Sequence, residues 1–262
     1  MVNVGVLASG RGSNFRAIME HQRLGVLENV NLPVLIYNYP DAPVKQIAEK
    51  YHVTNHFVDH KSRDRVEFER QIMDILESSQ VELVCLAGWD RIVGSDFFRK
   101  YRWKVMNIHP ALLPSFGWKG LNARFVHEAA LEYGVKITGC TVYFVDVSVE
   151  KGPIILQRPV QVLESERAMF DKKREDAIQS LSDRVLIHEH RTYSKAIQLY
   201  ADGRLKIEEV PSRAEETRVN RVVSVDLQGD WEKKWNERQR TFIEQQRTEW
   251  ASRMAETFEE SN

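Results

Sequence analysis

The chain opens with MVNVGVLASGRGSN (residues 1–14), and this stretch decides the fold. Its apolar run Val2–Ala8 predicts a strand buried on both faces, because a half-exposed strand would alternate apolar and polar residues. Gly10–Ser13 then predicts a tight turn, and the residues that follow predict a helix over Asn14–Leu24. A buried strand that leads through a glycine-rich turn into a helix is typical of the first unit of a parallel α/β sheet.

The same alternation continues through the first half of the chain. Strands are expected at Leu32–Tyr37, Asn55–Val58, Val81–Ala87 and Lys104–Ile108, and helices at Ala42–Tyr51 and Arg65–Ser78. Strands joined in this way run parallel, with right-handed crossovers. The sequence therefore predicts an α/β fold with a Rossmann-like, mostly parallel sheet that is flanked by helices.

The second half of the chain extends this body and then changes character. After a loop rich in Pro and Gly, we expect a helix around Val126–Tyr133, strands at Lys136–Val145 and Pro153–Val162, a helix at Ser180–Leu199 and a strand at Leu205–Val210. Residues 212–262 are highly charged, with apolar residues near helical spacing: Trp231, Trp235, Phe242, Trp250, Met254 and Phe258. We expect a domain over residues 1–211, followed by a charged helical extension that packs on the body or pairs with a second copy.

Charge and composition restrict the partners. The 262 residues carry a formal net charge of −1, so no global field attracts nucleic acid or an acidic membrane. No apolar segment approaches the roughly 20 residues that a bilayer span needs, and the N-terminus lacks the pattern of a signal peptide. Cys85 and Cys140 lie in apolar runs and are expected to be buried free thiols. We expect a cytoplasmic protein that binds neither nucleic acid nor membrane.

The turn after the first strand is a candidate anion site. Glycines allow a tight turn, and the backbone N–H groups of Gly12, Ser13 and Asn14 would point outward from a helix N-terminus, an arrangement that binds phosphate. The alternative is an ordinary turn in which Ser13 or Asn14 caps the helix. A dinucleotide site is less well supported, since Phe15 replaces the third glycine of the fingerprint and Tyr37-Asn38 stands where an acidic residue is needed.

A second candidate site is Asn107-Ile-His-Pro110, at the end of a predicted strand. Residues two apart share one face of a strand, so Asn107 and His109 project together at the edge where α/β sheets bind ligands. An amide donor beside an imidazole suits acyl transfer, because the amide can hold an oxyanion and the imidazole can donate to it or move a proton. The alternative is a strand-end turn with a solvated histidine.

Taken together, five runs resemble the phosphoribosylglycinamide formyltransferase family. They occur in that family's order, cover roughly residues 1–210, and are Gly10–Asn14, Leu86–Val93, Asn107–Phe116, Gly139–Asp146 and Gly152–Gln157. The run Asn-x-His-Pro-x-Leu-Leu-Pro from Asn107 is specific to folate-dependent formyltransferases and deformylases. The resemblance implies the formyltransferase fold and formyl transfer from 10-formyltetrahydrofolate, as co-substrate and without a metal, to the amine of glycinamide ribonucleotide in purine biosynthesis.

The resemblance also implies residue roles. Gly12, Ser13 and Asn14 would hold the ribonucleotide phosphate, and Glu189 would contact its sugar. The folate would be bound by Arg65, by the backbone of Asp90, Arg91, Ile92 and Val93, and by Asn107. The catalytic residues would be Asn107, His109 and Glu150, whose carboxylate favours the charged form of the imidazole.

The chain departs from the family at Glu150, at Tyr143, and in a loop usually richer in Gly and His, where Trp118, Arg124 and Phe125 stand. Glu150 stands where the family has Asp, and Tyr143 stands where His is common. These departures leave open a formyltransferase with another amine acceptor, a formyl-folate hydrolase, and a binding protein without catalysis. Transfer-RNA formylation would need a nucleic-acid domain, which the mixed-charge extension does not resemble.

Overall fold

A central sheet of seven strands organises the computed structural model, which describes residues 1–62, 64–117, 123–146, 152–211 and 219–259. The strands lie in the order β3-β2-β1-β4-β5-β6-β7. Their bounds are β1 Val2–Ala8, β2 Val30–Tyr37, β3 Thr54–Phe57, β4 Leu83–Leu86, β5 Val105–His109, β6 Ile137–Phe144 and β7 Ile154–Gln161. Strands β1 to β5 are parallel, while β6 and β7 continue the sheet antiparallel. The predicted Rossmann-like sheet and its two added strands are confirmed.

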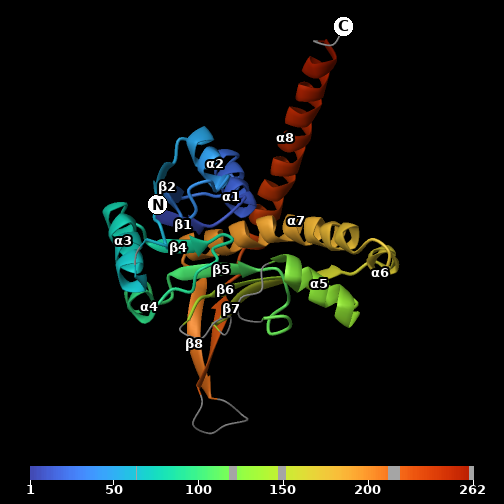
Figure 1. Cartoon of the computed structure of the whole chain (residues 1–262). Helices are drawn as coiled ribbons and strands as arrows, with labels where there is room; N and C mark the ends of the chain where they lie inside the picture. The colour runs from blue at the N-terminus through green and yellow to red at the C-terminus, as the bar shows by residue number, and fades with distance from the viewer. Residues whose placement is uncertain (63, 118–122, 147–151, 212–218, 260–262) are drawn as a thin grey trace.

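Helices cover both faces of the sheet (Figure 1). They are α1 Ser13–Arg23, α2 Val44–Lys50, α3 Arg65–Ser78, α4 Ser95–Lys100, α5 Ala123–Tyr133, α6 Glu164–Phe170 and α7 Arg174–Ala201. Successive β2 residues show how the strands supply both layers: Leu35 packs in the cluster with α1 and α7, whereas Ile36 packs in the cluster with α3 and α4. This alternation follows from the period of two in a strand and explains why the strands read as continuous apolar runs.

The strand order reverses between β1 and β4. The chain runs outward from β1 through β2 to β3, and then returns to β4 and β5 on the other side of β1. At such a switch point the loops after neighbouring strands separate, and open α/β sheets bind ligands there, at the carboxyl ends of the strands. The first loop, at residues 9–14, follows β1, and Asn107 and His109 end β5. Both predicted motifs therefore belong to one edge of the sheet.

The C-terminal part of the chain forms a hairpin and a long helix. Strand β8 (Leu205–Pro211) pairs antiparallel with β9 (Val219–Val225), and α8 (Trp231–Glu259) follows. The expected helix is present, but β9 was not predicted, although its valines mark a strand. The expected division after residue 211 falls between β8 and β9 and remains a prediction, since residues 212–218 lie outside the described part.

Helix α8 docks on the body through its first half. Trp231, Trp235 and Phe242 are buried in one cluster with Val26 and Leu199, and the two tryptophan rings stack with centroids 5.9 Å apart. The second half of α8 projects away from the sheet (Figure 1). We call the contact of α8 with α1 and α7 the seam.

The short helices α4 and α6 were also not predicted, because one or two turns carry too little periodicity to detect. Cys85 and Cys140 are buried free thiols, as expected. Among the described residues, no helix combines the length and the apolar character of a membrane span.

Candidate functional site

The first loop leaves the N-terminus of α1 open. The N-cap of this helix is Gly12, with φ 72° and ψ 27°, and no side chain caps the helix. The alternative of a Ser13 or Asn14 cap is therefore wrong. A Cβ atom at Gly12 would lie 2.4 Å from Cγ2 of Val44, so the position requires glycine for its space as well as for its left-handed backbone. The first turn carries no acidic residue, which leaves its backbone donors and the positive end of the helix dipole available to an anion.

Helix α7 brings Glu189 against this loop. The Asn14 side chain donates from Nδ2 to Oε2 of Glu189 over 2.9 Å, and both residues are buried. Burial raises the pKa of Glu189, and the Asn14 hydrogen bond and the nearby His109 imidazole only partly oppose this shift. The amide oxygen of Asn14 is buried without a hydrogen-bond partner among the described residues. The arrangement therefore offers acceptor oxygens to a ligand that carries hydroxyl groups.

Strand β5 carries the predicted catalytic pair. Asn107 donates from Nδ2 to the hydroxyl of Tyr143 over 2.9 Å, because the two residues stand opposite each other in the β5–β6 ladder. His109 is only 4% exposed, and its Nε2 donates to the carbonyl of Phe116 over 3.1 Å. The alternative of a solvated histidine is therefore wrong.

The loop after His109 is held by the neighbouring strands. Thr141 of β6 donates from Oγ1 to the carbonyl of Ala111 over 2.6 Å and accepts from the backbone N–H of Leu113 over 3.0 Å. Gln157 of β7 donates to the carbonyl of Leu113, also over 3.0 Å. Side chains from two of the sequence runs, Gly139–Asp146 and Gly152–Gln157, thus hold the loop of a third run, Asn107–Phe116.

The predicted folate residues lie together beside this pair. The segment 90–93 follows β4, whose last residue Leu86 pairs with Asn107. Arg65, at the start of α3, donates to the carbonyl of Ile92 over 3.3 Å and forms an ion pair with Glu69 at 2.8 Å. Ile92 is exposed, while Val93 is buried. The segment therefore presents backbone and an apolar side chain at the carboxyl end of β4.

Asp90 joins the folate segment to the first loop. It accepts hydrogen bonds from Ser9, Asn38 and Tyr39 over 2.9, 2.9 and 2.6 Å, and Arg91 lies at ion-pair distance. Burial disfavours the charged carboxylate, but these hydrogen bonds and Arg91 outweigh it and lower the pKa of Asp90. An ionised Asp90 thereby ties the ends of β1, β2 and β4 together.

The structure thus assembles most of the predicted site. The first loop, Glu189, Asn107 and His109 form what we call the strand-end site, and the residues predicted for folate border it. Glu150 lies outside the described residues. Among those that are described, no group of three His, Cys, Asp or Glu side chains is placed to hold a metal ion.

Two residues at this site were not assigned a role from the sequence. Tyr143 touches Asn107, and the buried His127 of α5 lies close enough to His109 for the two imidazoles to interact. Burial, followed by the influence of His109, lowers the pKa of His127 to about 4. Nothing in their spacing marks either residue, since both contacts depend on how β6 and α5 pack against β5.

Known proteins share this architecture and these motifs. The sequence pattern of the formyl transferase family matches residues 2–197. The trifunctional purine biosynthetic protein adenosine-3 of Homo sapiens is 40% identical over 207 residues, which are 79% of this chain and 19% of that protein. The chain thus spans about a fifth of the trifunctional relatives it matches.

Single-function relatives match over nearly their whole length. The phosphoribosylglycinamide formyltransferase of Bacillus subtilis is 33% identical over 201 residues, 76% of this chain and 94% of that protein. A crystal structure of glycinamide ribonucleotide transformylase 1 from Symbiobacterium toebii superposes with a TM-score of 0.73 at 35% identity, over 86% of this chain and 94% of that one. On this evidence, the chain belongs to the formyl transferase family.

Proposed function

We propose that this protein transfers the formyl group of 10-formyltetrahydrofolate to the amine of glycinamide ribonucleotide, a step of de novo purine biosynthesis. The observation that carries the proposal is the buried bond between Asn14 and Glu189 beside His109. This bond ties the N-terminus of α1, which suits a phosphate, to Glu189 of α7, which lies near His109 at the end of β5. The family membership and the single-function relatives support the same assignment.

The proposed acceptor site uses the first loop and Glu189. The open N-terminus of α1, with the backbone of Gly12, Ser13 and Asn14, would hold the phosphate. Glu189 and the unpartnered amide oxygen of Asn14 would accept hydrogen bonds from the sugar hydroxyls. A phosphorylated sugar could bind the N-terminus of α1 through its phosphate and these acceptor oxygens through its hydroxyl groups.

The proposed folate site uses Arg65, the segment Asp90–Val93 and Asn107. Exposed Arg65 supplies a cation for a carboxylate, and the backbone of the segment supplies donors and acceptors for a flat heterocycle. The buried indole N–H of Trp89 has no hydrogen-bond partner among the described residues, which fits a ligand that brings an acceptor. The bound 10-formyltetrahydrofolate supplies the formyl carbon that the acceptor amine attacks.

We assign the chemistry to Asn107, His109 and Glu150. Attack on the formyl carbon places negative charge on its oxygen, and the Asn107 amide and the His109 imidazole would stabilise that oxyanion. His109 would also move a proton toward the leaving folate nitrogen, with water as relay. Glu150 would favour the charged imidazole, in the place of the family's shorter aspartate.

The test of this function is whether consumption of formyl-folate depends on the acceptor. Incubation of the full chain with 10-formyltetrahydrofolate, with and without glycinamide ribonucleotide, should give turnover only when both are present. Loss of formyl without the acceptor would show a hydrolase instead. Binding of both compounds without turnover would show a non-catalytic homologue.

We also propose a cytoplasmic setting, in keeping with two buried free thiols, and pairing of two copies through α8. The support for pairing is that the C-terminal end of α8 projects from the body (Figure 1), beyond the residues that dock on it. Sedimentation analysis should give the mass of a dimer. A monomer at micromolar concentration would refute the pairing.

A further inference from the structure

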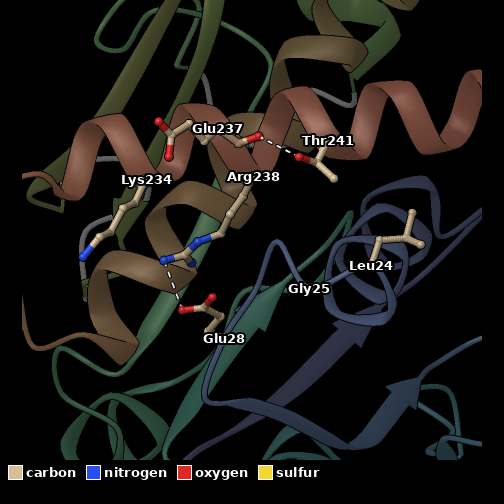
Figure 2. Close-up of a pocket in the computed structure, with 7 residues that line it drawn as sticks. All are labelled: Leu24, Gly25, Glu28, Lys234, Glu237, Arg238 and Thr241. Atoms are coloured by element: carbon tan, nitrogen blue, oxygen red, sulfur yellow. Dashed lines mark hydrogen bonds and ion pairs between the residues drawn. The ribbon is translucent and has the colours of Figure 1, made fainter.

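The seam contains two hollows, neither of which is lined by a predicted site residue. One, of about 520 Å³, lies between α8 and the end of α1, where Arg238 of α8 forms an ion pair with Glu28 (Figure 2). Each of its four charged side chains is in an ion pair, since Lys234 pairs with Asp230 and Glu237 with Lys233. The other, of about 660 Å³, lies further along α8, and we call it the seam hollow. Its volume is in the range of roughly 300–1,000 Å³ that is common for small-molecule sites.

The seam hollow gathers unmatched positive charge. Four cationic side chains line it from four helices: Arg16, Lys50, Arg191 and Arg247. In the described part of the chain, none of these four forms an ion pair with a carboxylate. The two acidic side chains of the lining, Glu20 and Glu249, instead pair with Arg23, at 2.9 and 3.0 Å. The hollow therefore presents more positive than negative charge to any ligand.

Two imidazoles in the lining have a nitrogen without a partner. His21 is 1% exposed; its Nδ1 interacts with the Ser194 hydroxyl over 2.7 Å, while its Nε2 has no hydrogen-bond partner among the described residues. Nε2 of His190 is buried in the same way. Burial lowers the pKa of each to about 4, helped by His190 and Arg191 for His21 and by Arg16 for His190, so both are neutral near pH 7. In the tautomer of His21 in which Nδ1 accepts from the Ser194 hydroxyl, Nε2 carries the N–H and can donate to an anion.

Apolar groups complete the lining. Ile187 of α7 is 51% exposed, and Phe242 of α8 packs against the His21 ring with centroids 4.3 Å apart. Cations with an adjacent apolar surface suit a ligand that combines phosphate groups with a flat apolar body.

We propose that the seam hollow is a second binding site, for a phosphorylated small molecule of the nucleoside diphosphate class, separate from the strand-end site. Arg16, Arg191 and Arg247 contact the phosphates, and Ile187 and Phe242 contact the base. Consecutive residues of α7 divide between the two sites: Glu189 meets Asn14, while His190 and Arg191 line the hollow.

The experiment titrates the full chain with ADP by calorimetry. The parent should bind ADP saturably, and Arg191→Glu and Arg247→Glu should each weaken binding roughly tenfold or more, about 1.4 kcal/mol. Arg240→Glu is the matched control, because Arg240 is exposed on α8 but does not line the hollow, and it should bind as the parent does. Pyrophosphate should bind more weakly than ADP, because it lacks the base that contacts Ile187.

Three results would overturn the proposal. They are an absence of saturable ADP binding, equal affinity in Arg247→Glu and Arg240→Glu, and loss of binding in Asn14→Ala, which would place the nucleotide in the first loop. Circular dichroism of each variant checks that the fold is kept, as expected for exposed arginines.

Discussion

The strand-end site and the seam both rest on α1 and α7, but they are held together differently. At the strand ends, polar side chains meet in buried hydrogen bonds, such as the one from Asn14 to Glu189. At the seam, tryptophan and phenylalanine rings fill the contact, and charged groups remain around it. Hydrogen bonds at the strand ends fix the orientation of side chains, as catalysis requires. Apolar burial at the seam stabilises the fold but does not orient side chains in this way. We therefore expect changes at the seam to alter stability, and changes at the strand ends to alter turnover.

The largest expected effect on stability is at the seam. Trp235→Ala removes a buried ring that stacks on Trp231, and should lower the free energy of unfolding by about 3–5 kcal/mol. Turnover per folded molecule should stay within a factor of about two to three. Denaturant unfolding and active-site titration measure the two quantities. The exposed neighbour Asn236→Ala should change stability by less than about 0.5 kcal/mol. A Trp235→Ala protein with the parent's free energy of unfolding but without turnover would contradict this contrast between the two regions.

Glu150→Gln should have the opposite effect, lowering turnover and not stability. It removes the charge that we assign to the support of the His109 imidazolium, and should lower kcat by about 10²-fold, the order expected when a charged catalytic neighbour is lost. Its pH–rate profile should also shift, while Glu150→Asp should remain active. Identical pH profiles for Glu150→Gln and the parent would remove this residue from the proposed mechanism.

Tyr143→Phe sharpens the comparison within the strand-end site. The change deletes the hydroxyl that accepts from Asn107 and leaves the amide less firmly oriented. We expect kcat to fall roughly tenfold, since one net hydrogen bond is worth about 1 kcal/mol or slightly more. KM for both substrates should be kept. A change in KM alone would indicate that Tyr143 binds a substrate and does not position Asn107.

The smallest effect per residue is on the pH dependence of stability. Burial lowers the pKa values of His21 and His190 at the seam, and of His127 near the strand ends, from 6.5 to about 4. The unfolded chain then binds more protons as pH falls below 6.5, so stability is full above that pH and declines toward pH 4. Unfolding at pH 7.5 and 5.5 should differ by about 1 kcal/mol for each histidine. His21→Asn should reduce the difference by that amount, and equal stability of the parent at both pH values would contradict the assignment.

The same contrast explains which parts of the fold and of the site could be predicted from the sequence. Apolar runs set the strands, and Asn107 and His109 share a face because of the period of two, so both were predictable from neighbours along the chain. The bond from Asn14 to Glu189 joins residues 175 positions apart, and only the family resemblance indicated that they share a site. The contacts of Tyr143, His127 and the seam imidazoles depend on packing between elements, which no local pattern contains.

The hairpin shows a different limit. The valines of β9 satisfy strand propensity, but charges before and after them make the whole segment resemble a polar helix. Its pairing with β8 settles the structure, because each strand alone has too little apolar surface to decide it.

The central claim is that Glu189 and His109 serve one site with different tasks, and steady-state kinetics of two variants tests it most directly. His109→Ala should lower kcat by about 10²–10³-fold and keep KM for glycinamide ribonucleotide, as expected for lost oxyanion stabilisation. Glu189→Gln should raise that KM roughly tenfold, keep kcat, and leave KM for the folate unchanged. Near-normal turnover in His109→Ala, or an unchanged KM in Glu189→Gln, would contradict the account.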